Sequence, residues 1–280
     1  MNGQDWMRID PGAPERAPVE LNTDRPHSAR IYDYHLGGKT NYPADRESAR
    51  AAEAAFPLLP LTARINRAFM HRAVARLARE EGIRQFLDVG TGIPTAPNLH
   101  ETVQAIAPDA RVVYADNDPI VLAHAQALLT GTPEGRTAYV DGDARDPKGI
   151  LGSPELAATL DLDRPVALSL VALLHFVSDE DGPRGIVAEF MDALAPGSFL
   201  VLSHVTADFS PQWAQALEAY KRNGTMGYLR TRDEVARFFD GLEMVEPGLV
   251  PAHTWHPEPG VPAPDAHALA TLHAGVARKR

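Results

Sequence analysis

A short stretch after the first strong apolar run combines a carboxylate, two glycines and two prolines. It reads DVGTGIPTAPN over residues 88–98 and follows the apolar run 83–87. A tight turn from a strand into a helix brings backbone close to a bound ligand, and Gly90 and Gly92 place no Cβ in the way. A proline further along can start the helix without losing an intrahelical hydrogen bond. The stretch predicts a ligand-binding loop, with a glycine turn that holds no ligand as the alternative.

A second acidic segment, ADNDP over residues 115–119, follows the next apolar run. In nucleotide-binding sheets, an acidic side chain that follows the second strand accepts hydrogen bonds from ribose hydroxyls. Asp116 follows the glycines at about the same spacing in the sequence as that side chain. Asn117 and Asp118 could instead cap a helix that opens at Pro119, and we favour the cap for Asp118. Asp116 is therefore the candidate ribose ligand.

Both segments belong to a repeating pattern that begins at residue 83. It predicts strands within 83–89, 110–116, 136–143, 165–176 and 198–205, followed in turn by helices near 98–106, 120–129, 155–159, 182–194 and 211–222. This alternation is typical of an α/β fold, with a mostly parallel sheet covered by helices on both faces. Ligands of such folds bind outside the carboxyl ends of the strands. The glycine stretch and Asp116 lie at the first two of these ends.

The rest of the chain completes this organisation. Residues 1–25 hold several prolines without sustained periodicity and are predicted to form an irregular arm. Residues 26–82 are a predicted helical extension, in which Pro57 and Pro60 divide the helical pattern of 44–81. Residues 83–280 are the predicted ligand-binding core. Its last part reads as a sixth strand over 241–250, a long loop over 251–264 and a seventh strand over 270–277.

The composition excludes several classes of protein. The chain has 280 residues, of which 44% are hydrophobic and 23% charged, as expected for a globular protein. No apolar run reaches the roughly 20 residues of a spanning helix, and the start lacks the features of a secretory signal, so we expect a cytoplasmic protein without a membrane segment. With no cysteine there is no disulfide, thiolate zinc site or cysteine nucleophile. The net charge of −10 argues against nucleic acid as a partner.

The loop departs from the dinucleotide fingerprint because Thr95 occupies the third small position and Pro94 intervenes. It resembles instead the first motif of class I S-adenosylmethionine-dependent methyltransferases, here Asp88-Val89-Gly90-Thr91-Gly92. The resemblance implies that the carboxylate of Asp88 faces the cationic methionine end of the cofactor while the backbone from Gly90 through Thr91 to Gly92 passes beside it. A carboxylate suits a sulfonium and an ammonium better than a pyrophosphate.

The third strand end, VDGDARDP over 140–147, resembles the adenine-binding motif of the same superfamily. In that motif a carboxylate accepts from the adenine amino group and a neighbouring backbone amide meets the ring, which Asp143 and Ala144 fit best. Asp141 and Asp146 are alternatives, and a solvated acidic turn would explain any of them.

A closer resemblance extends over nearly the whole chain from about Arg25. Several segments are similar to an actinomycete family of S-adenosyl methyltransferases that was formerly a domain of unknown function: SARIYDYHLGGKTNYPADRE, QFLDVGTGIPTAPNLHE, DNDPIVLAHAQALL, VALLHFVSDED, ALAPGSFLVLSH and RFFDGLEMVEPGLV. The first of them lies outside the general methyltransferase pattern, which makes the resemblance specific. It implies a Rossmann-like class I methyltransferase fold with a C-terminal antiparallel hairpin, and S-adenosyl-L-methionine as the cofactor. The acceptor stays open, and we expect a small molecule.

The N-terminal block supplies flat and polar side chains for an acceptor. Tyr32 and Tyr34 offer aromatic faces, Lys39 and Asn41 offer polar ends, and the Gly37-Gly38 pair permits a sharp bend over the crevice. A lid or acceptor wall is one interpretation of this block. A packed surface loop with half-buried tyrosines is the other.

Methyl transfer needs alignment of acceptor and methyl more than a general base. If the acceptor loses a proton, His175 after the fourth strand is the first candidate base and His204 after the fifth is the second, although a structural role is the more common use of a lone histidine. Trp255 in the long C-terminal loop could help to form the acceptor pocket or could anchor the loop in the core.

We expect no required metal, because cofactor binding and capping explain the aspartates better, and His253 and His256 lack further zinc ligands. Two other classes of function stay open. One is a noncatalytic regulator that binds S-adenosylmethionine, and the other is an NAD-dependent oxidoreductase. The oligomeric state is not readable from the sequence.

Overall fold

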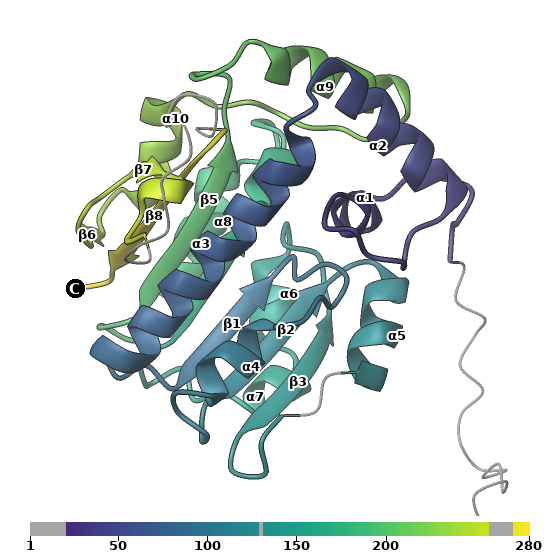
Figure 1. Cartoon of the computed structure of the whole chain (residues 1–280). Coiled ribbons are helices and arrows are strands. Elements are labelled where there is room, and N and C mark those ends of the chain that lie inside the picture. Colours follow the sequence, from purple (N-terminus) through teal and green to yellow (C-terminus); the bar gives the residue numbers. More distant parts are fainter. Residues whose placement is uncertain (1–20, 129–130, 258–270) are drawn as a thin grey trace, which may run out of the picture.

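One sheet of eight strands forms the centre of the computed structural model, which describes residues 21–128, 131–257 and 271–280 (Figure 1). The strands are β1 (Gln85–Val89), β2 (Arg111–Asp116), β3 (Arg136–Asp141), β4 (Ala167–Val171), β5 (Phe199–Val205), β6 (Glu243–Met244), β7 (Val250–Pro251) and β8 (Leu272–Arg278). Their order is β3-β2-β1-β4-β5-β8-β6, and β7 pairs with β8. β1 to β5 are parallel, whereas β8 is antiparallel to β5. The predicted α/β fold with a C-terminal antiparallel strand is confirmed.

The strand count differs by one from the predicted seven. The single strand expected over 241–250 is divided into β6 and β7, because a turn between them has Gly248 at φ +85 with its backbone nitrogen donating to Val245 O. Both short strands pair with β8. The strand expected from residue 270 is described from Leu272, and residue 270 itself lies outside the described residues.

Ten α-helices surround the sheet in the part of the chain that is described. They are α1 (Ser28–His35), α2 (Pro43–Ala55), α3 (Leu59–Glu80), α4 (Leu99–Gln104), α5 (Pro119–Leu128), α6 (Pro147–Leu151), α7 (Pro154–Ala157), α8 (Pro183–Asp192), α9 (Gln212–Arg222) and α10 (Arg232–Ala236). The five helices expected after the parallel strands are present, as α4, α5, α7, α8 and α9. The break at Pro57 and Pro60 separates α2 from α3, as predicted.

No separate helix was predicted over residues 28–35, because this part of the helical extension was expected to form a lid or a surface loop. Residues 28–35 instead form two helical turns with Arg30, Ile31, Asp33 and His35 buried. The helix ends at His35. Gly37 follows the C-cap with φ +81, which suits glycine, and the backbone nitrogen of Gly38 donates to Asp33 O at 2.8 Å. The glycine pair thus makes a helix end rather than a hinge over the crevice.

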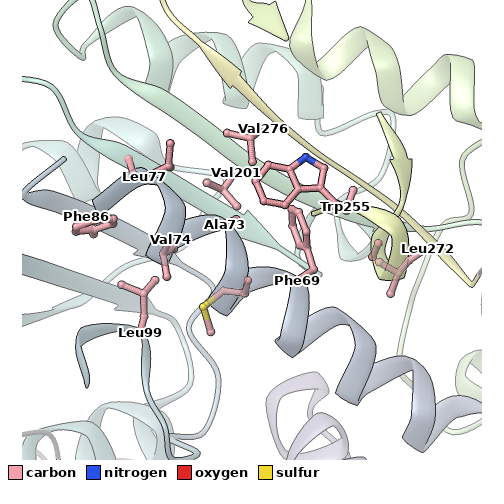
Figure 2. Packing of buried hydrophobic residues seen from close by; sticks show 14 of the residues in the cluster. Phe69, Ala73, Val74, Leu77, Phe86, Leu99, Val201, Trp255, Leu272 and Val276 are labelled. Atoms are coloured by element: carbon pink, nitrogen blue, oxygen red, sulfur yellow. The ribbon is translucent and has the colours of Figure 1, made fainter. Parts of the chain in front are cut away.

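The core has two layers, one on each face of the sheet, because neighbouring strand residues point to opposite sides. Phe86 faces α3 and α4, and Leu87 faces the layer of α6, α7 and α8. Figure 2 shows the first layer, in which Phe69, Val74 and Leu77 of α3 meet strand residues. α3 therefore belongs to the sheet's own packing, although it precedes the predicted core boundary at residue 83.

Helices α1, α2 and α9, which we call the cap, pack on one another beside the carboxyl ends of the parallel strands (Figure 1). Asp45 fixes the start of α2, since its carboxylate accepts from the backbone nitrogens of Tyr42 at 2.8 Å and His27 at 2.9 Å. The buried Arg30 forms ion pairs with Asp45 at 3.8 Å and Asp118 at 3.4 Å. Asp118 follows β2, so these pairs join the cap to the second strand end.

Among the described residues, no helix combines the length and the apolar character that crossing a bilayer requires.

Candidate active site

A cavity of about 350 Å³ lies at the carboxyl ends of β1 to β4 and extends between α3 and the cap. Its wall at the strand ends includes Asp88, Gly90, Thr91, Gly92, Asp116, Asn117, Asp143 and Ala144. The structure therefore brings together all eight residues that the sequence assigned to cofactor binding. Their placement follows from the parallel sheet, which brings the ends of consecutive strands to one edge.

The glycine loop is attached to the second strand. The backbone nitrogens of Gly90 and Thr91 donate to Ala115 O at 2.8 and 3.3 Å, and that of Gly92 donates to the Asp116 carboxylate at 2.8 Å. Gly90 and Gly92 have φ of +73 and +69, which L side chains rarely adopt. A Cβ on Gly90 would approach a methyl carbon of Leu173 at 2.5 Å. Both glycines are thus favoured by backbone conformation, and a side chain at Gly90 would also have to displace Leu173.

Asp116 is held rigidly by the backbone around it. Its carboxylate accepts from the nitrogen of Gly92 with one oxygen and from that of Asp118 at 2.9 Å with the other. Each carboxylate oxygen keeps a second lone pair that can accept from a ligand hydroxyl. Burial raises the pKa of Asp116, and the two backbone hydrogen bonds work against that rise. Asp118 accepts from Ile120 N at 2.9 Å, which confirms the expected helix cap.

Asp88 lies at the end of β1 in the cavity wall. Burial raises its pKa to about 6, an effect that the nearby positive charge of Arg67 partly offsets. A carboxylate that is poorly solvated gains from a cationic ligand, because the ligand charge replaces the lost hydration. The position therefore suits an ammonium or a sulfonium.

Arg67 of α3 was missed by the sequence analysis. Its guanidinium donates to Pro97 O at 2.7 Å and to Thr95 O, so it holds the far half of the loop. Burial lowers its pKa, while Tyr32, Asp88 and other groups counteract that shift. The available signal was a charged residue next to Asn66, within the apolar stripe of a helix that leads to the first strand.

Asp143 at the end of β3 is already paired. Arg145 donates to it from its backbone nitrogen and from Nε, both at 2.9 Å, and from Nη2 at 2.5 Å. Asn117 adds a donor at 3.2 Å. These contacts, Arg145 above all, lower the pKa of Asp143 to about 2. Asp143 is thus a fixed anion in the cavity wall, with Ala144 beside it.

The structure divides the four candidate residues of the N-terminal block. Tyr32 lines the cavity, and its hydroxyl donates to Ala63 O at 3.0 Å and accepts from Asn66 Nδ2 at 2.9 Å. Tyr34 and the exposed Lys39 lie outside the lining. Asn41 is buried and donates to Asp33 at 2.8 Å and to Gly38 O at 3.0 Å, contacts that fix the end of α1. The geometry therefore supports a wall residue only at Tyr32.

A buried network of hydrogen bonds continues from Tyr32 across the molecule. Asn66 Oδ1 accepts from the hydroxyl of Ser203 in β5 at 2.5 Å, and Ser203 Oγ accepts from Ala172 N at 2.9 Å. Ala172 lines the cavity with φ +53, a conformation that costs energy for any residue with a Cβ. This network of hydrogen bonds fixes α1, α3 and the end of β4 relative to one another.

His175 lines the cavity, while His204 lies behind it without entering the wall. Arg230 donates to His204 Nε2 at 2.9 Å, and the two histidine rings lie 5.7 Å apart. Burial lowers the pKa of His175 well below its ordinary value, and His204 and Arg230 add to that effect. His175 is therefore a neutral imidazole that resists protonation, and its Nδ1 is buried with no hydrogen-bond partner.

Trp255 is fully buried in the first core layer, and its ring meets Phe69 edge-on at 5.4 Å (Figure 2). It does not line the cavity. The structure thus corrects the acceptor-pocket interpretation in favour of the buried anchor, because the loop after β7 folds back onto α3. Arg72 secures that loop through Trp255 O at 2.9 Å and Ala252 O at 2.7 Å. Among the described residues no group of three His, Asp or Glu side chains is arranged to hold a metal ion.

Comparison with known proteins identifies the family. The family model for S-adenosyl methyltransferases matches residues 14–280. The chain belongs to this S-adenosyl methyltransferase family. A search of curated proteins gives no match.

Solved structures agree with the family. The S-adenosyl methyltransferase resembles a DUF574 family protein from Streptomyces avermitilis, with 52% identity, a TM-score of 0.90, and coverage of 93% of this chain and 100% of that one. A candidate methyltransferase from Thermobifida fusca is 40% identical, with a TM-score of 0.86. The match covers 93% of this chain and 97% of that one. An O-methyltransferase family protein from Burkholderia thailandensis shares the fold alone, at 14% identity, a TM-score of 0.52, and coverage of 88% and 63%. The chain is thus a methyltransferase that depends on S-adenosylmethionine.

The residues present fit that cofactor. The carboxylates of Asp88 and Asp116 suit a ligand with an ammonium, a sulfonium and ribose hydroxyls, while the acceptor sites of Asp143 are taken by Arg145 and Asn117. The loop has few backbone donors left for a pyrophosphate, because the nitrogens of Gly90, Thr91 and Gly92 bond within the protein and that of Thr95 donates to Asn98 at 3.1 Å. A dinucleotide needs those donors for its phosphates. The methyltransferase loop therefore disfavours the oxidoreductase alternative.

Proposed function

We propose that this methyltransferase transfers the methyl group of S-adenosylmethionine to a small-molecule acceptor inside the cavity, by in-line displacement. The observation that carries the proposal is the continuity of the cavity. It runs from the carboxylates at the strand ends to a wall built by α3 and the cap, so one space can hold both reactants. Holding two reactants in line supplies much of the rate of such a reaction.

The residues at the strand ends hold the cofactor in this proposal. Asp88 faces its cationic methionine end beside the loop of Gly90, Thr91 and Gly92. Asp116 accepts from the ribose hydroxyls, with Asn117 beside it. Asp143 and Ala144 meet the adenine, and Arg145 keeps Asp143 in place. When bound, the cofactor supplies an activated methyl group, and the chain orients the acceptor toward it.

The other half of the cavity receives the acceptor. Tyr32 presents its ring from α1, and the apolar side chains of Leu59, Leu217 and Leu229 exclude water. We assign His175 a hydrogen bond to the acceptor through its free Nδ1 rather than the role of a base, since its surroundings resist protonation. α1 and α9, rather than all of 26–82, serve as the cover of the site.

Methyl transfer from isotope-labelled S-adenosylmethionine tests this proposal. The purified protein is incubated with pooled phenols, catechols and primary amines, and in parallel with DNA, RNA and a denatured protein mixture. We expect label in the small-molecule pool, matched by S-adenosylhomocysteine, and none with the Asp116→Ala variant. Label in a macromolecular fraction would contradict the acceptor class. Binding of the cofactor with no transfer to any pool would favour a noncatalytic regulator.

A further inference from the structure

Three polar side chains of the cap form a hydrogen-bonded series that ends at the cavity. His35 of α1 lies between the other two, with Nδ1 at 3.0 Å from Glu53 Oε1 of α2 and Nε2 at 2.6 Å from Tyr220 Oη of α9. His35 and Tyr220 line the cavity, and Glu53 stands behind them with its side chain 26% exposed. None of the three lies in the strand-end motifs of the family, and packing alone does not require three polar groups in series.

The donors and acceptors in this series follow from its chemistry. An ionised carboxylate only accepts, so Nδ1 of His35 carries a hydrogen and donates to Glu53. Burial lowers the pKa of His35, which makes the ring neutral near pH 7. Nε2 is then an acceptor, and Tyr220 donates its hydroxyl hydrogen to it. The Tyr220 oxygen keeps its lone pairs for a donor in the cavity.

Two further residues of the cavity wall carry a polar atom without a partner. Trp213 Nε1 and Thr225 Oγ1 are buried without a hydrogen bond, and both residues line the cavity. The backbone nitrogen of Thr225 donates to Tyr220 O at 3.0 Å, which keeps the two residues together. Polar groups thus accompany the apolar surface in this part of the cavity wall.

On the basis of the proposed function, we propose that Tyr220 binds and deprotonates the hydroxyl of an oxygenated aromatic acceptor, and that His35 and Glu53 are positioning residues that receive the proton. The wall suits such a molecule, since Leu59, Met70 and Leu217 give apolar surface and Trp213 and Tyr220 give flat faces.

Methyl transfer in this proposal is accompanied by a proton transfer through Tyr220 to His35. The acceptor hydroxyl proton passes to the Tyr220 oxygen while the Tyr220 proton passes to Nε2 of His35. The acceptor oxygen forms the new bond to the methyl carbon, and the electron pair of the broken carbon–sulfur bond stays on sulfur. His35 is left as an imidazolium beside the Glu53 carboxylate, whose exposed side gives the proton a route to solvent. No free tyrosinate is needed, which fits the raised pKa that burial gives Tyr220.

Binding of a matched pair of probes tests the proposal without turnover. Protein loaded with S-adenosylhomocysteine is titrated with 2-naphthol and with 2-methoxynaphthalene, which lacks the hydroxyl hydrogen. We expect wild type to bind 2-naphthol about tenfold more tightly, the worth of one good hydrogen bond. Tyr220→Phe should bring the ratio to about 1 while 2-methoxynaphthalene still binds. Tyr34→Phe removes a hydroxyl from the ring that packs against His35 outside the cavity lining, and should keep the ratio.

The contrary results are distinct. A wild type without preference, or a Tyr220→Phe variant that keeps it, overturns the proposal, whereas equal weakening of both probes would mark Tyr220 as structural only. Nitrogen-15 NMR of His35 gives an independent readout in wild type: hydrogen on Nδ1 is expected, and hydrogen on Nε2 overturns the series. Failure to bind S-adenosylhomocysteine at the loading step would instead count against the proposed function itself.

Discussion

Gly92 donates its backbone hydrogen to the Asp116 carboxylate at 2.8 Å, and this bond joins the loop after β1 to the end of β2. The two residues that the sequence assigned separately to the cofactor's methionine end and ribose are thus one mechanical unit. Asp116 both shapes the loop and presents the remaining lone pairs of its carboxylate to the cavity. A change at Asp116 is expected to affect cofactor binding through both effects.

Asp88 should make stability depend on pH. Its pKa is about 6 in the folded protein against 3.8 ordinarily, so the folded state keeps a proton that the unfolded state has lost. This stabilisation is present at low pH and is lost as pH rises through 6. The free energy of unfolding of the ligand-free wild type, measured relative to that of Asp88→Asn, should fall by about 2 kcal/mol between pH 4.5 and 7. Urea unfolding of both proteins at the two pH values measures it, and parallel pH trends would contradict the burial of this charge.

Trp255 should matter for stability and little for the cofactor. Removing the buried ring in Trp255→Ala leaves a cavity beside Phe69 and should cost about 3–5 kcal/mol. Trp255→Phe should cost less, and should keep affinity for S-adenosylhomocysteine within about threefold of wild type. Urea unfolding and calorimetric titration give the two values. A stable Trp255→Phe variant that no longer bound S-adenosylhomocysteine would instead indicate that Trp255 takes part in the binding site.

The N-terminal block offers a comparison between wall and surface. Tyr34→Ala and Lys39→Ala should leave binding of S-adenosylhomocysteine and methyl transfer unchanged, since neither side chain lines the cavity. Tyr32→Phe should destabilise the protein by about 1–3 kcal/mol, because the amide of Asn66 loses its buried partner. Thermal unfolding and the labelled-transfer assay separate these effects. Loss of transfer in Lys39→Ala, with the fold intact, would restore the lid interpretation.

His175→Gln should change acceptor affinity without changing the pH profile of transfer. The imidazole resists protonation beside His204 and Arg230, so it does not titrate in the working range. We expect a raised KM for the acceptor and a profile between pH 6 and 8.5 that matches wild type. Tyr220→Phe is the comparison, because it should lower kcat. If the acidic limb of the profile disappeared in His175→Gln, the base would be His175.

The gathering of the proposed cofactor-binding residues could be predicted from the sequence, because parallel strands bring local motifs to one edge of the sheet. Asp88, Asp116 and Asp143 each follow an apolar run, and the fold alone brings the three carboxylates to one cavity. The helix over 28–35 was missed because three of the four side chains that it buries, those of Arg30, Asp33 and His35, are polar, so no apolar periodicity marks its two turns.

The acceptor end could not be read in the same way. His35, Glu53 and Tyr220 come from three helices. Tyr220 lies far from His35 in the sequence, after all five parallel strands. Their meeting depends on the packing of α9 against α2, whereas the repeating strand–helix pattern predicts that α9 covers the sheet. Trp255 could equally have lined a pocket or filled the core, since its residue type serves both, and the decision came from the packing on Phe69.

The most direct test is calorimetric titration of the purified protein with S-adenosylmethionine, S-adenosylhomocysteine and NAD, beside Asp116→Ala and Asp141→Ala. Asp141 pairs with Asp116 in the sheet register but is exposed and outside the cavity lining, which makes it the matched control. We expect saturable binding of the first two ligands and none of NAD, weakened at least tenfold in a folded Asp116→Ala and unchanged in Asp141→Ala. Preferential binding of NAD, or an Asp116→Ala variant with wild-type affinity, would contradict the site described for this family member.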